Sequence, residues 1–129
     1  MDEYYNLLRK FKATNDENFC GAMAYSLITG THPVISSRKL GRKHGKGTSG
    51  LRLNQALRDA GYHLVEVVGV RGYVENLPSK GLTNGTYLVY SAAHVSVIKD
   101  GVVLDWTAEK TARSKRARIC YQILKTEAV

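Results

Sequence analysis

Three residues of types that carry out nucleophilic catalysis, Cys20, His94 and Asp105, stand out by their sequence surroundings. Cys20 follows the run NDEN (residues 15–18), whose side chains cap helices well, and lies at the start of a stretch with helical periodicity. The exposed N–H groups and the dipole at a helix start favour a thiolate, which is the nucleophilic form of cysteine. Cysteine is also a common small residue of apolar helix faces, so Cys20 alone leaves both interpretations open.

His94 and Asp105 lie on either side of Asp100-Gly101, a residue pair typical of tight hairpin turns, between two β-rich runs. Facing residues of a hairpin share one side of the sheet. The facing pairs that this turn predicts are Lys99 with Val102, Ile98 with Val103, Val97 with Leu104, and Ser96 with Asp105. His94, Ser96 and Asp105 should then share one face, with the carboxylate in reach of the imidazole. Such a carboxylate orients the base of a nucleophilic triad. The alternative is that this side of the hairpin faces solvent and carries three ordinary polar residues.

The other histidines and a metal site are the competing explanations. His63 begins a predicted strand and His44 lies in a basic loop, and neither has an acid placed as Asp105 is relative to His94. His94 is therefore the better candidate, ahead of these two and of His32. Cys20, His94 and Asp105 are also types that bind zinc, but the cysteine spacing matches no zinc-knuckle pattern. We expect no metal and no other cofactor.

Length and composition predict one globular domain spanning residues 1–129. No window approaches the roughly 18 to 20 apolar residues that cross a bilayer, so we expect no membrane association. The first residues begin with acids and lack an apolar signal core, which predicts a cytoplasmic protein whose Cys20 and Cys120 are reduced.

The net charge of +8 is concentrated in two basic runs, Arg38–Lys46 and Lys110–Arg118. Such runs can contact nucleic acid phosphates or an acidic protein partner. The alternative is that they are solvated loops that keep a small protein soluble.

The hydrophobic periodicity predicts helices first and antiparallel strands later, which is the α+β pattern. Helices are expected at 2–12, at 19–29, and from a cap at Thr48 or Ser49 to Gly61. The Gly-, Ser- and Lys-rich stretch 31–50 is expected to be a mobile loop that covers or selects substrate. A helical turn is expected at 73–77, and strands at 62–70, 86–91, 94–99, 102–106 and 117–125.

Three segments, in order, resemble the papain-like peptidases that process bacteriocin leaders beside ABC transporters. NFCGAMAYSLITG is similar to their nucleophile helix, GTSGLRLNQALRDAGYHLVEV to the next helix and strand, and GTYLVYSAAHVSVIKDGVVLDW to the segment with their histidine and aspartate. The resemblance implies a papain-like fold in which N-terminal helices pack on a C-terminal antiparallel sheet. It also implies that Cys20 is the nucleophile, His94 the general base and acid, and Asp105 the orienting residue.

The sequence departs from this family near the nucleophile. The family has a glutamine that donates to the oxyanion six residues before its cysteine, where this chain has Thr14; the nearest amide is Asn15. Phe19 and Trp106 also replace an aspartate and a proline of the family pattern. The resemblance therefore predicts a thiol hydrolase acting on a peptide or protein amide, as a peptidase, isopeptidase or deamidase, without the leader-peptide substrate. The alternative is a catalytically weak papain-like module that binds nucleic acid or an acidic protein through its basic runs.

Overall fold

A computed structural model of the chain describes residues 6, 9, 10, 20–41, 48–92, 94–104 and 116–126. The chain divides into two compact units, Met1–Ala60 and Gly61–Val129, which are described here one at a time. The described part of the chain contains three α-helices, all in the first unit, and a five-stranded antiparallel sheet in the second. The predicted α+β class, with helices before strands, is therefore confirmed.

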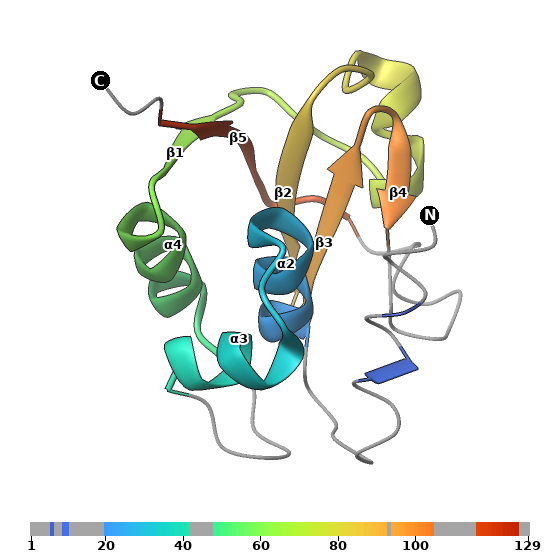
Figure 1. The fold of residues 1–129 in the computed structure, drawn as a ribbon. Coiled ribbons are helices and arrows are strands. Elements are labelled where there is room, and N and C mark those ends of the chain that lie inside the picture. Colours follow the sequence, from blue (N-terminus) through green and yellow to red (C-terminus); the bar gives the residue numbers. More distant parts are fainter. Residues whose placement is uncertain are drawn as a thin grey trace. The chain divides into compact units, whose positions relative to one another are not determined.

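The described helices of the first unit are α2 (Cys20–Thr29), α3 (Pro33–Lys39) and α4 (Gly50–Asp59), and α2 contacts both of the other helices (Figure 1). The side chains of Ser26 on α2 and Ser36 on α3 are fully buried, and their hydroxyl oxygens lie 2.6 Å apart in a hydrogen bond. A buried polar pair of this kind fixes how two helices meet, because separating the hydroxyls would break a bond shielded from water and leave the Ser36 hydroxyl only its 3.5 Å bond to the Thr31 carbonyl.

Helix α3 corrects the expectation that residues 31–50 form a loop throughout. Its start is built by His32, whose ring Nδ1 accepts a hydrogen bond of 3.2 Å from the Val34 N–H. Pro33 follows at the beginning of the helix, where its fixed φ suits the first turn and its missing N–H costs nothing. These two local signals outweigh the loop-like composition of the stretch.

Helix α4 begins where the sequence predicts. The Ser49 hydroxyl accepts a hydrogen bond of 3.2 Å from the Arg52 N–H, as an N-cap does. The chain then leaves the helix through Gly61, which has a positive φ of 95°. Of the expected helix at 2–12, the structure describes only residues 6, 9 and 10, and these three are helical.

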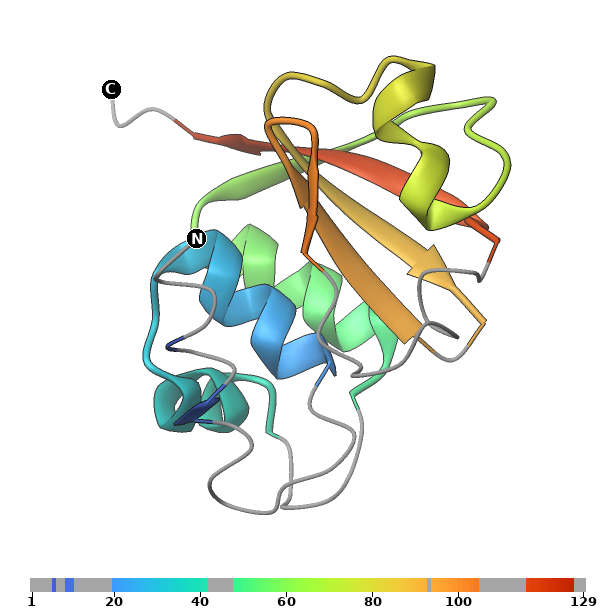
Figure 2. The same cartoon turned by 90° about the vertical axis from the view of Figure 1, so that its right-hand side faces the viewer.

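The sheet of the second unit has the order β1-β5-β2-β3-β4, and every neighbouring pair is antiparallel (Figure 2). Its strands are β1 (Tyr62–Glu66), β2 (Thr86–Ser91), β3 (His94–Lys99), β4 (Val102–Leu104) and β5 (Ile119–Lys125). The last strand of the chain thus lies between the first two. All five strands were expected, and β2 and β3 have the predicted bounds.

The β3–β4 hairpin has the predicted register over its described length. Lys99 pairs with Val102, Ile98 with Val103, and Val97 with Leu104. Asp100 and Gly101 form the turn with φ of 48° and 82°, the left-handed conformation that a two-residue hairpin turn of this type requires. The register therefore puts His94, Ser96 and Ile98 on one face of the sheet.

That face is covered at one end by two short 3₁₀ helices, η1 (Val74–Asn76) and η2 (Pro78–Lys80), as Figure 2 shows. The turn expected at 73–77 is thus present as 3₁₀ helix. The buried core between these turns and the sheet is formed by Val74, Leu77, Leu82, Val89, Ile98 and Cys120.

Strand β1 is shorter than the 62–70 expected from the apolar run. It ends at Glu66, after which the Val67 N–H still donates to the Cys120 carbonyl at 2.8 Å. The chain then turns at Val68 and Gly69, where Gly69 has a positive φ of 84°. Glycine within an apolar run is a signal for such a turn. Strand β5 also begins two residues later than expected, at Ile119.

Candidate active site

Cys20 is the first described residue of α2 and is half-buried. The first N–H groups of a helix have no acceptor within the helix and point toward its start, which is the environment predicted for a nucleophilic thiol. Neither Cys20 nor Cys120 forms a disulfide, so both are thiols. Cys20 therefore lies at the start of a helix, as the sequence predicts.

Gly21, the residue after Cys20, lies against Thr48. A Cβ added to Gly21 would come within 3.2 Å of the Thr48 Cβ, closer than side-chain carbons ordinarily approach. The absence of a side chain at position 21 thus lets the segment before α4 contact the start of α2. Within the first unit, the structure brings together the Cys-Gly and Gly-Thr-Ser motifs that the sequence singles out.

His94 is the first residue of β3 and pairs with Ser91 on β2. His94 is 6 % exposed, Ser91 7 % and Ser96 0 %, and all three lie on the same face of the sheet. The Ser91 and Ser96 hydroxyls are buried and have no hydrogen-bond partner among the residues that the structure describes. The alternative explanation was that His94 and Ser96 lie on a side of the hairpin that faces solvent. Both residues are buried, so that explanation is wrong for them. Burying a hydroxyl without a hydrogen-bond partner costs free energy.

The other two predicted site residues, Asp105 and Asn15, lie outside the described residues. The predicted facing pair of Ser96 with Asp105 falls one step beyond the described register, which ends at Val97 with Leu104. Cys20 belongs to the first compact unit and His94 to the second, so the structure describes each within its own unit.

The competing histidines have other surroundings. His32 is exposed and caps α3 through its ring nitrogen, and His63 is exposed on β1, paired with Leu124. His44 lies outside the described residues. Of the three histidines that the structure describes, His94 is the one that is buried.

Cys120 provides an internal contrast to Cys20. It is 1 % exposed in the core of the second unit, and this burial raises the pKa of its thiol from 9.0 to about 11. Desolvation disfavours the charged thiolate, so Cys120 stays protonated at neutral pH. A thiol in that state is a poor nucleophile, which leaves Cys20 as the candidate.

The described basic side chains of the two basic runs are exposed. Arg38 and Lys39 form the last turn of α3, and Arg116 and Arg118 precede β5. The Arg116 guanidinium lies 4.9 Å from the centre of the Tyr73 ring, a cation–π contact. The remainder of both runs is outside the described residues.

The described ranges contain neither a cluster of metal ligands nor a membrane-spanning helix. No three His, Cys, Asp or Glu side chains in them are grouped so as to hold a metal ion. Likewise, no helix in those ranges has the length and apolar character needed to cross a membrane.

Comparisons of this chain with protein-family models, with curated proteins and with solved structures found no match. The likeness to leader-processing peptidases stays a prediction that depends on the three motifs and their order.

Proposed function

We propose that this chain is a thiol hydrolase of papain-like type that cleaves a peptide bond or a side-chain amide. Cys20 is the nucleophile, His94 the general base and acid, and Asp105 the residue that orients His94. The observation that carries the proposal is the burial of His94 at the start of β3, beside two buried serine hydroxyls on a sheet face whose register agrees with the prediction.

The proposed reaction proceeds in two steps. His94 takes the proton of the Cys20 thiol, and Sγ attacks the amide carbonyl carbon. The C–N bond then breaks, and the amine leaves with the proton that His94 returns. In the second step, water attacks the thioester with His94 again as base, which releases the acid and restores the thiol. The N–H of Cys20 stabilises the oxyanion, with Asn15 as the proposed side-chain donor.

The two cysteines of the chain allow a direct test of the nucleophile. We expect iodoacetamide to alkylate Cys20 well below pH 9.0, the ordinary pKa of a thiol, because a thiolate–imidazolium pair forms with His94. Cys120 should remain unmodified until the pH approaches about 11. Peptide mass spectrometry between pH 4 and 10 follows the modification of Cys20 and the expected absence of modification at Cys120 in one sample.

Matched histidine variants identify the base. His94→Ala should remove the reactivity of Cys20 at low pH, whereas His63→Ala, which changes an exposed histidine on β1, should leave it unchanged. Equal pH dependence of Cys20 in the native protein and in His94→Ala would overturn the pairing. Circular dichroism of each variant separates this result from loss of the fold.

The bond class is tested next with peptide, isopeptide and glutamine-amide substrates, with Cys20→Ser as the inactive control. If Cys20 shows no enhanced reactivity, the binding-module alternative predicts salt-dependent affinity for nucleic acid or an acidic protein. The exposed Arg38 and Lys39 are two of the described positions at which to test that affinity.

A further inference from the structure

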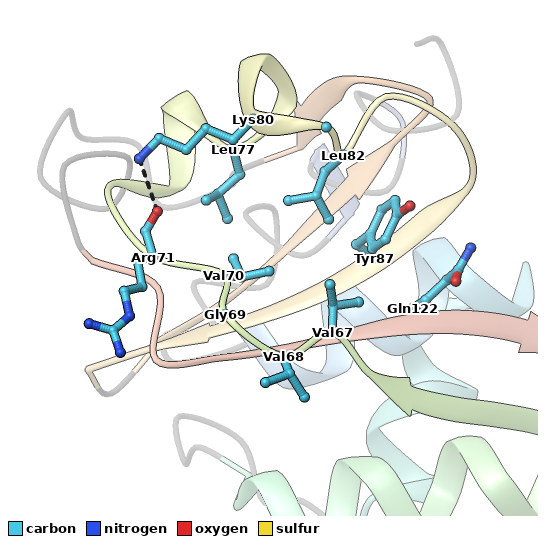
Figure 3. A pocket seen from close by; sticks show the side chains of 11 residues that line it. Val67, Val68, Gly69, Val70, Arg71, Leu77, Lys80, Leu82, Tyr87 and Gln122 are labelled. Carbon is cyan, nitrogen blue, oxygen red and sulfur yellow. Dashed lines mark hydrogen bonds between the residues drawn. The ribbon is translucent and has the colours of Figure 1, made fainter.

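The second unit contains a hollow of about 460 Å³ that takes no part in the proposed chemistry (Figure 3). All of its lining residues belong to Gly61–Val129. It lies between the turns after β1, the η2 region, and the sheet face that carries Tyr87 and Gln122. Small-molecule sites in proteins have volumes of roughly 300 to 1,000 Å³, so the hollow is large enough for a small ligand.

The hollow exists because the segment 67–82 covers only part of the sheet face. Residues 67 and 72 of this segment are each held to the β5 region by a backbone hydrogen bond of 2.8 Å. The Val67 N–H donates to the Cys120 carbonyl, and the Ala117 N–H donates to the Gly72 carbonyl. Fixed in this way, the backbone arches away from the sheet at Gly69 instead of continuing β1. The apolar run that predicts a longer strand thus supplies one wall of the hollow.

The interior of the hollow is apolar. Leu77 is 0 % exposed and Leu82 5 %, and the partly buried Val70 and Tyr87 pack against the same core. Figure 3 shows these four side chains along the length of the hollow. At its edge, Val68 is 85 % exposed, which leaves a large apolar side chain in solvent beside the opening.

One end of the hollow is positively charged. Arg71 and Lys80 stand there, opposite the end with Tyr87 and Gln122 (Figure 3), and no lining residue is acidic. The Lys80 ammonium donates a hydrogen bond of 3.0 Å to the Arg71 carbonyl, which holds the cation at the rim. Gly72 makes room for it, because a Cβ at that position would lie 2.5 Å from Lys80 Nζ.

We propose that this hollow binds a small apolar carboxylic acid. Its carboxylate lies against the Lys80 ammonium, and its apolar body extends past Val70 toward Tyr87, both of which are partly exposed in the hollow. A cation at one end of an apolar surface, with no acid among the lining residues, matches a ligand with one anionic head. The inference does not depend on Cys20 or His94, since neither lines the hollow.

The test uses decanoate as probe and decanol, its uncharged counterpart, both below their aggregation limits. Isothermal titration at low salt should show saturable binding of decanoate to one site. Decanol should bind about tenfold more weakly, since it lacks the charge-assisted contacts at the rim. No saturable binding, or equal affinity for the acid and the alcohol, would overturn the proposal.

Surface variants locate the site without disturbing the core. Lys80→Gln should weaken decanoate binding by about three- to tenfold and leave decanol binding unchanged, whereas Arg71→Gln should weaken it less, because the Arg71 guanidinium points away from the Lys80 ammonium (Figure 3). Val68→Asp, which puts a negative charge beside the opening at a well-exposed position, should also weaken decanoate. The control is Lys99→Gln, because Lys99 is an exposed cation on the opposite face of the sheet. If Lys99→Gln weakens decanoate as much as Lys80→Gln does, binding is a general effect of net charge and the site is wrong.

Discussion

Gly85 and Asp100 are joined by two hydrogen bonds across the end of the sheet. The Gly85 N–H donates to the Asp100 carboxylate at 3.0 Å, and the Asp100 N–H donates to the Gly85 carbonyl at 2.9 Å. These bonds tie the β3–β4 turn to the residue that precedes β2. The turn thereby fixes two strand pairings at once, including the one that places His94 opposite Ser91.

Asp100→Ala should lower the free energy of unfolding by roughly 1 to 2 kcal/mol, because it removes the side-chain acceptor and puts a residue of poor left-handed tolerance at φ 48°. Asp100→Asn should lose much less, since its amide oxygen accepts the same bond and asparagine tolerates this conformation. Urea unfolding of both variants measures the difference. Equal losses would show that the turn does not depend on this contact.

The buried hydroxyl pair of Ser26 and Ser36 should behave as one unit. Each single change to alanine should cost about 1 to 2 kcal/mol of stability, because it leaves the other hydroxyl buried without this partner. The double variant should lose about 1 kcal/mol less than the sum of the singles. A double-mutant cycle from urea unfolding tests this, and strict additivity would contradict the hydrogen bond.

The N-cap of α4 should contribute a measurable part of the stability of the first unit. Ser49→Ala should cost about 1 kcal/mol, because the Arg52 N–H loses its acceptor. Ser49→Asp restores an acceptor of similar reach and should retain most of the stability. Thermal unfolding of the two variants side by side distinguishes capping from any other role of the serine.

Burial of Cys120 should make stability fall at alkaline pH. Its thiol keeps its proton to about pH 11 in the folded protein but titrates near 9.0 when solvated. The folded state binds this proton more tightly than the unfolded state does. The stabilisation of the folded state by the protonated thiol is therefore complete below pH 9.0 and is lost as the pH rises to about 11. We expect a loss on the order of 2 kcal/mol across this range.

The control for this pH dependence is Cys120→Ala. Tyrosines and lysines titrate in the same range, so the informative quantity is the difference between the two stability–pH curves. The variant will be less stable throughout, because it leaves a small cavity in the core, but its curve should fall less steeply between pH 9 and 11. Parallel curves would mean that the Cys120 thiol titrates alike in the folded and unfolded states.

Local signals in the sequence determined much of the secondary structure. Asp100-Gly101 sets the hairpin register because a two-residue turn leaves only one way to pair the flanking strands. Ser49 marks the start of α4 because its side chain satisfies an N–H only a few residues away. The α+β class and the shared face of His94 and Ser96 follow from the same kind of short-range information.

Other features depended on contacts between distant parts of the chain. The place of β5 between β1 and β2 is decided by which strand edges and apolar faces meet, and no local pattern encodes that choice. The end of β1 at Glu66 is decided in the same way, because Val67 and Val70 pack against the core formed by the η1–η2 segment and the sheet instead of extending a strand. The burial of His94, the raised pKa of Cys120 and the hollow beside Lys80 arise only from this packing. The residue types in the sequence show which chemistry is available. Which of those groups are excluded from water depends on the folded surface as a whole, so only the tertiary structure decides it.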